Sequence, residues 1–253
     1  MTYLDELREW GRHFSHWAIL ILIFSLFFFS FGLKQFAIFG QVILVPVLAP
    51  QSFSVLFFEI VKNDLVPEGV SFIVTNPASA FTSQALISVL LALVFSVPYI
   101  LYTLIRYLSP ALFVREQKAI IGVIVPSVLL FVSGMLFAYF FIIPPTFSFL
   151  YDFAPRIGAI PLFSVNEFIS LVFSLVVITG FSFLLPVCMF LMSRLGLIPG
   201  IVWRKNWRIA CVAFLIFAAL ITPDGSGITM AFLSLPLCAL YGLGVFLSGR
   251  LSN

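Results

Sequence analysis

Long runs of apolar residues alternate with short polar segments along the whole 253-residue chain. A helix that crosses the hydrocarbon core of a bilayer needs about 20 consecutive apolar residues. The runs are continuous rather than alternating, which argues against a strand barrel. We therefore expect an all-α integral membrane protein with six transmembrane helices. These lie near residues 17–39, 81–105, 119–143, 167–192, 209–221 and 228–247, and the fifth is short for a full bilayer.

The segments between these runs predict shorter elements. Residues 2–15 place apolar side chains at helical spacing among charged ones, which predicts an amphipathic N-terminal helix. Residues 54–64 have a similar pattern and predict a short helix lying in the membrane interface. The outer segments 40–80 and 144–166 are punctuated by prolines. Because proline ends helices, we expect both segments to be shaped caps outside the helices.

Composition and charge support one membrane domain, 1–253, and give it an orientation. The chain is 62% hydrophobic and 9% charged, far from the average of a soluble protein. With six spans, ten of the 13 basic residues lie on the side that holds both termini. Excess Lys and Arg mark the cytoplasmic side, so both termini are expected there. The opposite side holds Lys34, Lys62 and Arg156.

Two carboxylates stand out against this basic background. Glu6 and Glu116 are among only four acids on the predicted cytoplasmic side. A carboxylate accepts an arginine guanidinium in a bidentate, charge-assisted pair, and lysine fits such a site less well. The alternatives are a solvated helix face for Glu6 and, for Glu116, a weak exposed ion pair with Arg115 or Lys118.

Six blocks of sequence resemble the TatC family, the receptor subunits of the twin-arginine translocase. They are LDELR at 4–8, PYILYTLIRYLSPALFVREQKA at 98–119, GMLFAYFFIIPP at 134–145, FSFLLP at 181–186, ITPDGSG at 221–227 and LPLCALYGLGVFL at 235–247. The resemblance implies six helices in a curved, cupped wall with both termini cytoplasmic, in a plasma or inner membrane. It also implies a receptor without enzymatic activity or cofactor. Such a receptor binds twin-arginine signal peptides and moves folded proteins across the lipid bilayer with TatA-type and TatB-type partners. We also expect a homo-oligomer within a larger complex, and no nucleic-acid partner.

The resemblance assigns roles to individual residues. Glu6 and Glu116 match the two carboxylates of the family's signal-peptide site. Leu7 and Arg8 match the motif around the first carboxylate, and Pro110 and Arg115 match the motif around the second. Two further residues match family positions in the outer loops, namely Pro46 and Asp224.

This chain also departs from the family at three membrane positions. Leu184 stands where many members carry a glutamate in the fourth helix. Tyr102-Thr103 replaces Tyr-Gln in the second helix, and Tyr241-Gly242 replaces Tyr-Glu in the sixth. The resemblance implies that these positions contact partner subunits. We therefore expect the partner surface to be altered, or to use Thr103, Thr179 and Ser182 instead.

Other functions are weighed against the same residues. Cys188, Cys211 and Cys238 lie in apolar runs, so they are interpreted as small buried hydrophobes rather than as a disulfide frame, and no CxxC or Cys/His spacing indicates a metal site. An intramembrane protease would need a catalytic pair within the bilayer, and no such pair is present. A secondary transporter of small solutes or ions remains the alternative, although the nearly charge-free spans do not favour it.

Overall fold

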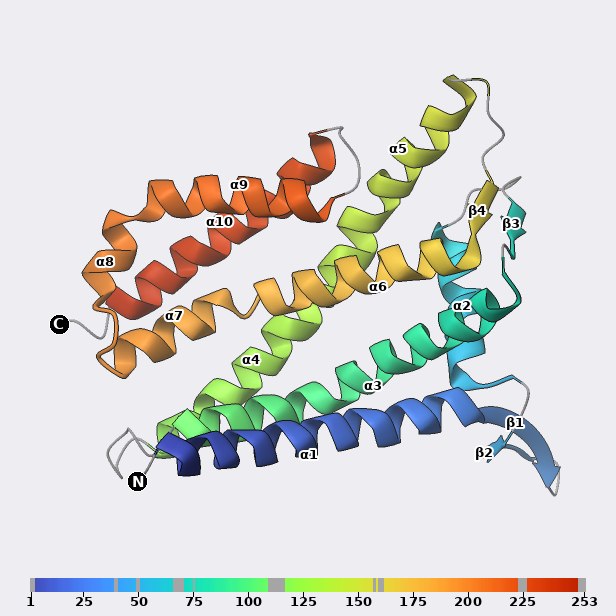
Figure 1. The fold of residues 1–253 in the computed structure, drawn as a ribbon, viewed down its shortest axis with the longest axis horizontal. Helices are drawn as coiled ribbons and strands as arrows, with labels where there is room; N and C mark the ends of the chain where they lie inside the picture. Colours follow the sequence, from blue (N-terminus) through green and yellow to red (C-terminus); the bar gives the residue numbers. More distant parts are fainter. Residues whose placement is uncertain are drawn as a thin grey trace. The chain divides into compact units, whose positions relative to one another are not determined.

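A computed structural model describes residues 3–38, 41–48, 51–65, 71–74, 76–108, 117–156, 158, 162–222 and 227–249, for some of them by the backbone alone. These residues are mostly helical (Figure 1). The chain divides into two compact units, which are described separately. The first contains residues 1–103 and 162–173, and the second contains residues 104–161 and 174–253.

The first unit combines three helices with two small sheets. Its elements are α1 (Tyr3–Ser30), β1 (Phe31–Ile38), β2 (Gln41–Leu48), α2 (Phe53–Leu65), β3 (Ser71–Ile73), most of α3 (Pro77–Leu108), β4 (Leu162–Ser164) and the start of α6 (Val165–Ser182). Strands β1 and β2 pair antiparallel, and β3 and β4 pair parallel.

Helix α1 joins the predicted amphipathic segment to the first apolar run without a break. The prediction that this run stays helical to residue 39 is wrong, because α1 ends at Ser30 and the next eight residues form β1. Its partner β2 is rich in β-branched residues, which fit a pleated strand better than a helix. At the turn from α1 into β1, a side chain on Gly32 would collide with the carbonyl oxygen of Gln51. Only glycine fits this close approach.

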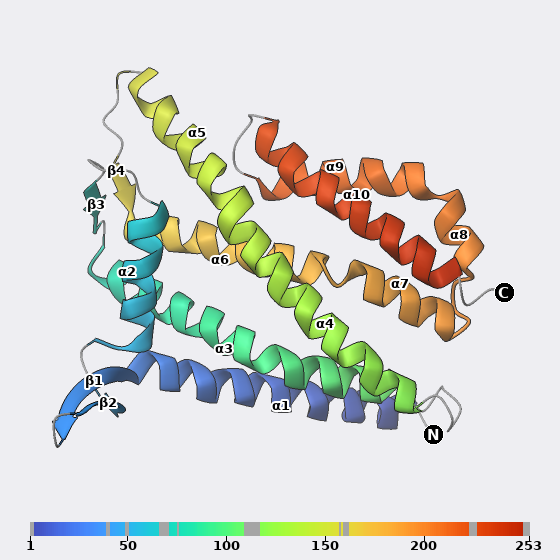
Figure 2. The same cartoon turned by 180° about the vertical axis from the view of Figure 1, so that it is seen from behind.

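Helices α1 and α3 lie side by side and antiparallel (Figures 1 and 2). The indole Nε1 of Trp17 donates a hydrogen bond of 2.7 Å to the hydroxyl of Thr103. At the other end of the pair, the Gln84 amide donates to the carbonyl oxygen of Phe29, at 3.3 Å, and to the hydroxyl of Ser52, at 3.0 Å. The last carbonyls of a helix lack partners within it, so Gln84 caps α1 while tying it to α3 and to the start of α2.

The predicted short helix at 54–64 is present as α2, with Val61 and Leu65 buried. The segment after α2 is fixed by the pairing of β3 with β4 and by an edge-on contact between the rings of Phe72 and Phe168, 5.1 Å apart. Neither small sheet was predicted from the sequence, which predicted the end of a helix at β1 and proline-shaped segments at the other three strands. The strands of both sheets hold the outer segments of this unit against its helices.

The second unit consists of helices. Its elements are α4 (Gln117–Phe137), a π-helical turn η3 (Ala138–Ile142), α5 (Ile143–Arg156), the remainder of α6, α7 (Leu185–Arg194), α8 (Gly200–Lys205), α9 (Trp207–Ile221) and α10 (Ile228–Gly249). The six-residue helix α8 was not predicted from the sequence.

Elements α4, η3 and α5 follow one another as a single long rod (Figure 1). The prediction that the helix ends at Pro144 is wrong. Proline cannot donate a backbone hydrogen bond, and its ring clashes with the preceding α-helical turn. Here the wider π turn comes directly before Pro144, and the amide of Ile143 reaches back five residues to the carbonyl of Ala138. The widened turn makes room for the prolines, and the helix continues.

The predicted fourth span divides into two helices. Helix α6 ends at Ser182, and α7 begins at Leu185 with Pro186 in its first turn. The amide of Leu184 donates to the carbonyl of Phe181, three residues back, which tightens the chain at the break. Pro186 has no N–H to donate to the carbonyl four residues earlier, so the interruption falls where this residue requires it.

Helix α10 packs closely against α7 and α8 because glycines lie at the crossings. A Cβ added at Gly244 would lie 3.2 Å from the Cα of Pro186 and 2.5 Å from the sulfur of Met189. A Cβ at Gly200 would lie 2.9 Å from the carbonyl oxygen of Ser248. Close backbone approach at small residues is how helices associate in membranes, where water supplies no driving force.

Four segments are helical, long and apolar enough to cross a membrane by length and composition: 77–104, 122–151, 165–194 and 229–249. Two shorter apolar helices, 14–30 and 207–221, lie at the other two predicted spans. The predicted fifth span is therefore confirmed as a short helix. The count of six crossings remains a prediction.

We expect Gly244→Ala to destabilise the protein by about 1–3 kcal/mol, because the added methyl overpacks the contact with Pro186 and Met189. Gly242→Ala is the matched control on the same helix, since a Cβ there meets nothing within 4 Å. The control should be neutral or gain up to about 1 kcal/mol from helix propensity. Thermal unfolding of the two variants in detergent, followed by circular dichroism, measures the difference. Equal shifts would contradict the packing argument.

The hydrogen bond from Trp17 to Thr103 should be measurable as a coupling free energy. In a double-mutant cycle with Trp17→Phe and Thr103→Val, we expect the two side chains to be coupled by about 0.5–1.5 kcal/mol. Each single variant should lower the unfolding midpoint, and the second substitution should then cost little more. Strict additivity of the two losses would show that the bond does not hold α1 to α3.

Candidate functional site

The residues predicted to bind a signal peptide are only partly placed. Glu6, Leu7 and Arg8 lie in the first turns of α1, for which the structure gives the backbone. Pro110, Arg115 and Glu116 lie outside the described residues, as does Asp224. The predicted proline of the first outer segment, Pro46, lies in β2 opposite Leu33.

The antiparallel pairing of α1 with α3 determines which helix ends are neighbours. Trp17 contacts Thr103, and further along the pair the ring of Phe28 lies 5.2 Å from that of Phe95. The N-terminal end of α1, which carries Glu6, therefore belongs to the same end of the pair as Thr103. Glu6 is eleven residues before Trp17 in one helix, which corresponds to about 16 Å along the axis.

Two of the three hydroxyl groups predicted to replace the family's polar contacts are used within the chain. The Thr103 hydroxyl accepts from Trp17 and is within 3.0 Å of the carbonyl of Tyr99 in its own helix. The Ser182 hydroxyl donates to the carbonyl of Ile178 at 2.7 Å. Such bonds satisfy a helix's own polar groups and leave little for a partner. The hydroxyl of Thr179 is buried and has no partner among the described residues.

Leu184 lies at the break between α6 and α7. Its side chain is 7% exposed and is therefore part of the core of the second unit. Its carbonyl oxygen accepts hydrogen bonds from the amides of Val187 and Cys188, both at 3.0 Å, and so starts α7. An apolar residue at this place needs no polar partner in the bilayer.

Tyr241 lines a pocket in the second unit. Its side chain is 6% exposed, and its hydroxyl donates a 2.7 Å hydrogen bond to the carbonyl of Trp203. The Trp203 indole in turn donates to the hydroxyl of Ser193, at 3.1 Å. The pocket beside Tyr241 has a volume of about 280 Å³. It is lined by Arg204, Trp207, Cys211, Cys238, Tyr241, Gly242 and Val245.

The lining of this pocket combines charged, aromatic and apolar groups. Arg204, at the end of α8, brings a positive charge to it, and Trp207 adds an exposed indole. The guanidinium of Arg208 lies 5.6 Å from the centre of the Trp207 ring, within range of a cation–π contact. The remaining wall offers Val245, the bare backbone of Gly242 and the thiols of Cys211 and Cys238. We refer to this site as the α9–α10 pocket. Its two cysteines are half-buried and Cys188 is exposed, so the prediction of buried cysteines is wrong.

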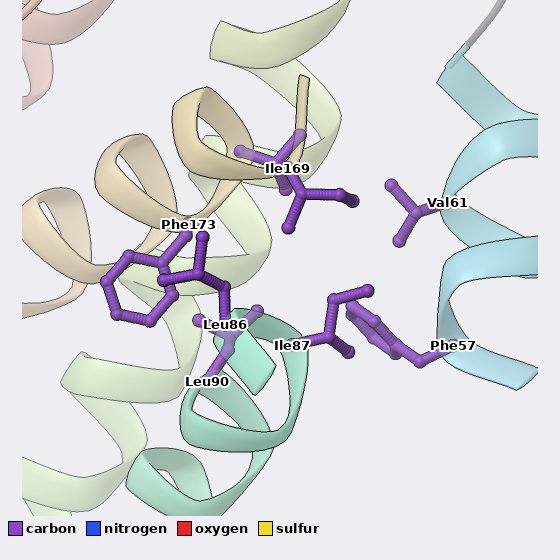
Figure 3. A pocket seen from close by; sticks show the side chains of 8 residues that line it. Phe57, Val61, Leu86, Ile87, Leu90, Ile169 and Phe173 are labelled. Atoms are coloured by element: carbon purple, nitrogen blue, oxygen red, sulfur yellow. The ribbon is translucent and has the colours of Figure 1, made fainter. Parts of the chain in front are cut away.

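A second cavity lies in the first unit between α2, α3 and α6 (Figure 3). Its volume is about 10 Å³, which is about that of one water probe, and its walls are entirely apolar. Such a void stays dry and is too small for a ligand. We therefore interpret it as a packing gap. Its lining is Phe57, Val61, Leu86, Ile87, Leu90, Ile169, Val172 and Phe173.

Sequence reasoning did not single out Trp17 or Trp203, which anchor Thr103 and Tyr241, or the pocket residues Arg204 and Trp207. Trp and basic residues are enriched at membrane interfaces, and this enrichment could have indicated these residues in the sequence. No group of three or more His, Cys, Asp or Glu side chains suited to a metal ion occurs among the described residues.

Comparison with known proteins gives concordant matches. The family model described as Sec-independent protein translocase protein (TatC) matches residues 2–236. TatC of Cenarchaeum symbiosum is 34% identical over 251 residues, covering 98% of this chain and 93% of that protein. TatC of Escherichia coli strain K12 is 33% identical over 184 residues, covering 72% of this chain and 70% of that protein. A crystal structure of the twin arginine translocase receptor TatC is similar with a TM-score of 0.74 and 29% identity, covering 97% of this chain and 98% of that one.

The similarity therefore extends over nearly the whole chain in sequence and in fold. It confirms the resemblance found in the six sequence blocks and a membrane fold built mainly of helices. Apolar helices and family together indicate a multi-pass membrane protein. The chain belongs to the TatC family of Sec-independent protein translocase proteins.

Proposed function

We propose that this chain is the receptor subunit of a twin-arginine protein export system, with Glu6 and Glu116 as the carboxylates that hold the two arginines of a signal peptide. The observation that carries the proposal is family membership along almost the whole chain. Both carboxylates stand at the family's positions in the sequence. The chain acts by binding and carries out no chemical reaction.

The chemistry of the two side chains supports the assignment. A guanidinium presents a planar fork of donors that matches a carboxylate, so two carboxylates favour an arginine pair over a lysine pair. Glu6 is on a helix whose end is set by the antiparallel packing of α1 on α3. Glu116 follows α3 in the sequence.

We further propose a plasma or inner membrane location with both termini in the cytoplasm, and TatA-type and TatB-type membrane proteins as partners. The asymmetry of Lys and Arg supports this orientation. Since Thr103, Ser182 and Tyr241 use their hydroxyls inside the chain, the contacts to partners would rest mainly on exposed apolar side chains. Tyr102 and Phe181, which are 41% and 48% exposed, neighbour two of these positions.

Peptide binding to the full-length protein in nanodiscs tests the receptor site. A twin-arginine signal peptide should bind about ten-fold or more tightly than its twin-lysine variant, because each charge-assisted pair contributes about 1.5–3 kcal/mol. Glu6→Gln and Glu116→Gln should each reduce this preference several-fold. Titration of a fluorescent peptide measures both quantities.

Glu59→Gln is the matched control, since Glu59 is an exposed acid on α2 and is not assigned to the site. It should leave the preference for arginine unchanged. Equal affinities for the two peptides, or an equal effect of all three substitutions, would rule out the carboxylate clamp. That result would favour a secondary transporter for small solutes or ions as the alternative.

A further inference from the structure

We propose that the α9–α10 pocket binds an anionic phospholipid, with the phosphate on Arg204 and the hydrocarbon lying along α9 and α10. The pocket is separate from the carboxylates assigned to signal-peptide binding. Its volume of about 280 Å³ is near the lower end of small-molecule sites, which begin at about 300 Å³. Its lining joins one arginine to a mostly apolar wall.

Charge complementarity makes the occupant anionic. Every charged side chain that the structure describes in the second unit is basic, and no carboxylate there pairs with Arg204. Arg204 is exposed, and its neighbours Lys205 and Arg208 are exposed as well. An arginine at the mouth of a pocket offers several N–H donors to phosphate oxygens. The ammonium of a zwitterionic headgroup would meet the same positive field and be disfavoured.

The surroundings of the pocket make the occupant a lipid. The outward faces of the two helices are apolar, with Ile209 at 69% exposed, Val212 at 56%, Leu243 at 54% and Phe246 at 57%. A soluble anion would leave these faces uncovered, whereas acyl chains cover them. Trp207 lies at the start of α9 between charge and hydrocarbon, where tryptophan is enriched in membrane proteins. Basic pockets between membrane helices are a recurrent form of headgroup site.

Two residues make the pocket open. Gly242 contributes no side chain, and an added Cβ meets nothing within 4 Å, so the space beside it is free. Tyr241 is held back by its hydrogen bond to the carbonyl of Trp203 and by the ring of Phe214, whose centre is 5.9 Å away. A larger residue at position 242 would therefore fill the site without displacing the neighbouring helices.

Native mass spectrometry of the purified full-length protein tests the proposal. We expect one phosphatidylglycerol to be retained per chain, and phosphatidylcholine with the same acyl chains to be lost about ten-fold more readily. Arg204→Gln should weaken retention of phosphatidylglycerol about ten-fold by removing the charge. Gly242→Leu should weaken it to a similar extent by filling the pocket while leaving the charge in place.

Arg194→Gln is the control. This substitution also removes one positive charge from the second unit, but Arg194 does not line the pocket. The control variant should retain phosphatidylglycerol like the unsubstituted protein. Equal retention of the two lipids, or retention that survives both Arg204→Gln and Gly242→Leu, would overturn the proposal. Free glycerophosphate that binds as tightly as the lipid would also overturn it, since the site would then recognise phosphate alone. Circular dichroism confirms that each variant is folded.

Discussion

The structure depends on one constraint: inside hydrocarbon, a polar group must find its partner within the protein. Most serines of the helices meet the constraint locally, although the buried hydroxyls of Ser96 and Thr179 have no partner among the described residues. The hydroxyls of Ser88, Ser127, Ser182 and Ser248 each donate to the carbonyl four residues earlier in their own helix. A few side chains instead satisfy groups on other elements, and these define the packing. Gln84 closes the end of α1, Trp17 reaches Thr103, and Tyr241 reaches the carbonyl of Trp203.

Prolines show how the same constraint can have opposite outcomes. At Pro186 the helix is interrupted, and the amides after the break bond to the carbonyl of Leu184. At Pro144 the helix continues, because a π turn widens the spiral just before the ring. The sequence alone distinguishes these cases poorly, since both prolines follow long apolar runs. Pro98, Pro126 and Pro236 lie inside α-helices with neither a break nor a π turn, so a proline in an apolar run does not by itself decide the outcome.

The regular helical runs were predictable because they follow from length and hydropathy. The short fifth helix and the helix at α2 were anticipated to within two residues of their bounds. The hairpin of β1 and β2 was not predicted. The apolar residues of β1 extend the first hydrophobic run, so the change from helix to strand after Ser30 could not be seen in the sequence. Of the proposed site, Glu6 and Glu116 were assigned through a resemblance carried by short blocks, and this assignment stays a prediction. The α9–α10 pocket was not predicted, because it depends on the empty space beside Gly242. The pattern of polar and apolar residues in the sequence does not reveal such a space.

The contacts of Leu184 and Gly242 explain two of the departures from the family in physical terms. A glutamate at position 184 would have to be buried where Leu184 is 7% exposed, next to backbone groups that already have partners. Burying a carboxylate there would be costly without a counter-charge. At position 242 the opposite holds, because the glycine leaves open space beside Arg204. One departure thus removes a polar group from a packed core, and the other leaves Arg204 beside open space with no carboxylate among the described side chains of its unit. An anionic lipid of the membrane has the chemistry to pair with Arg204 in this open space.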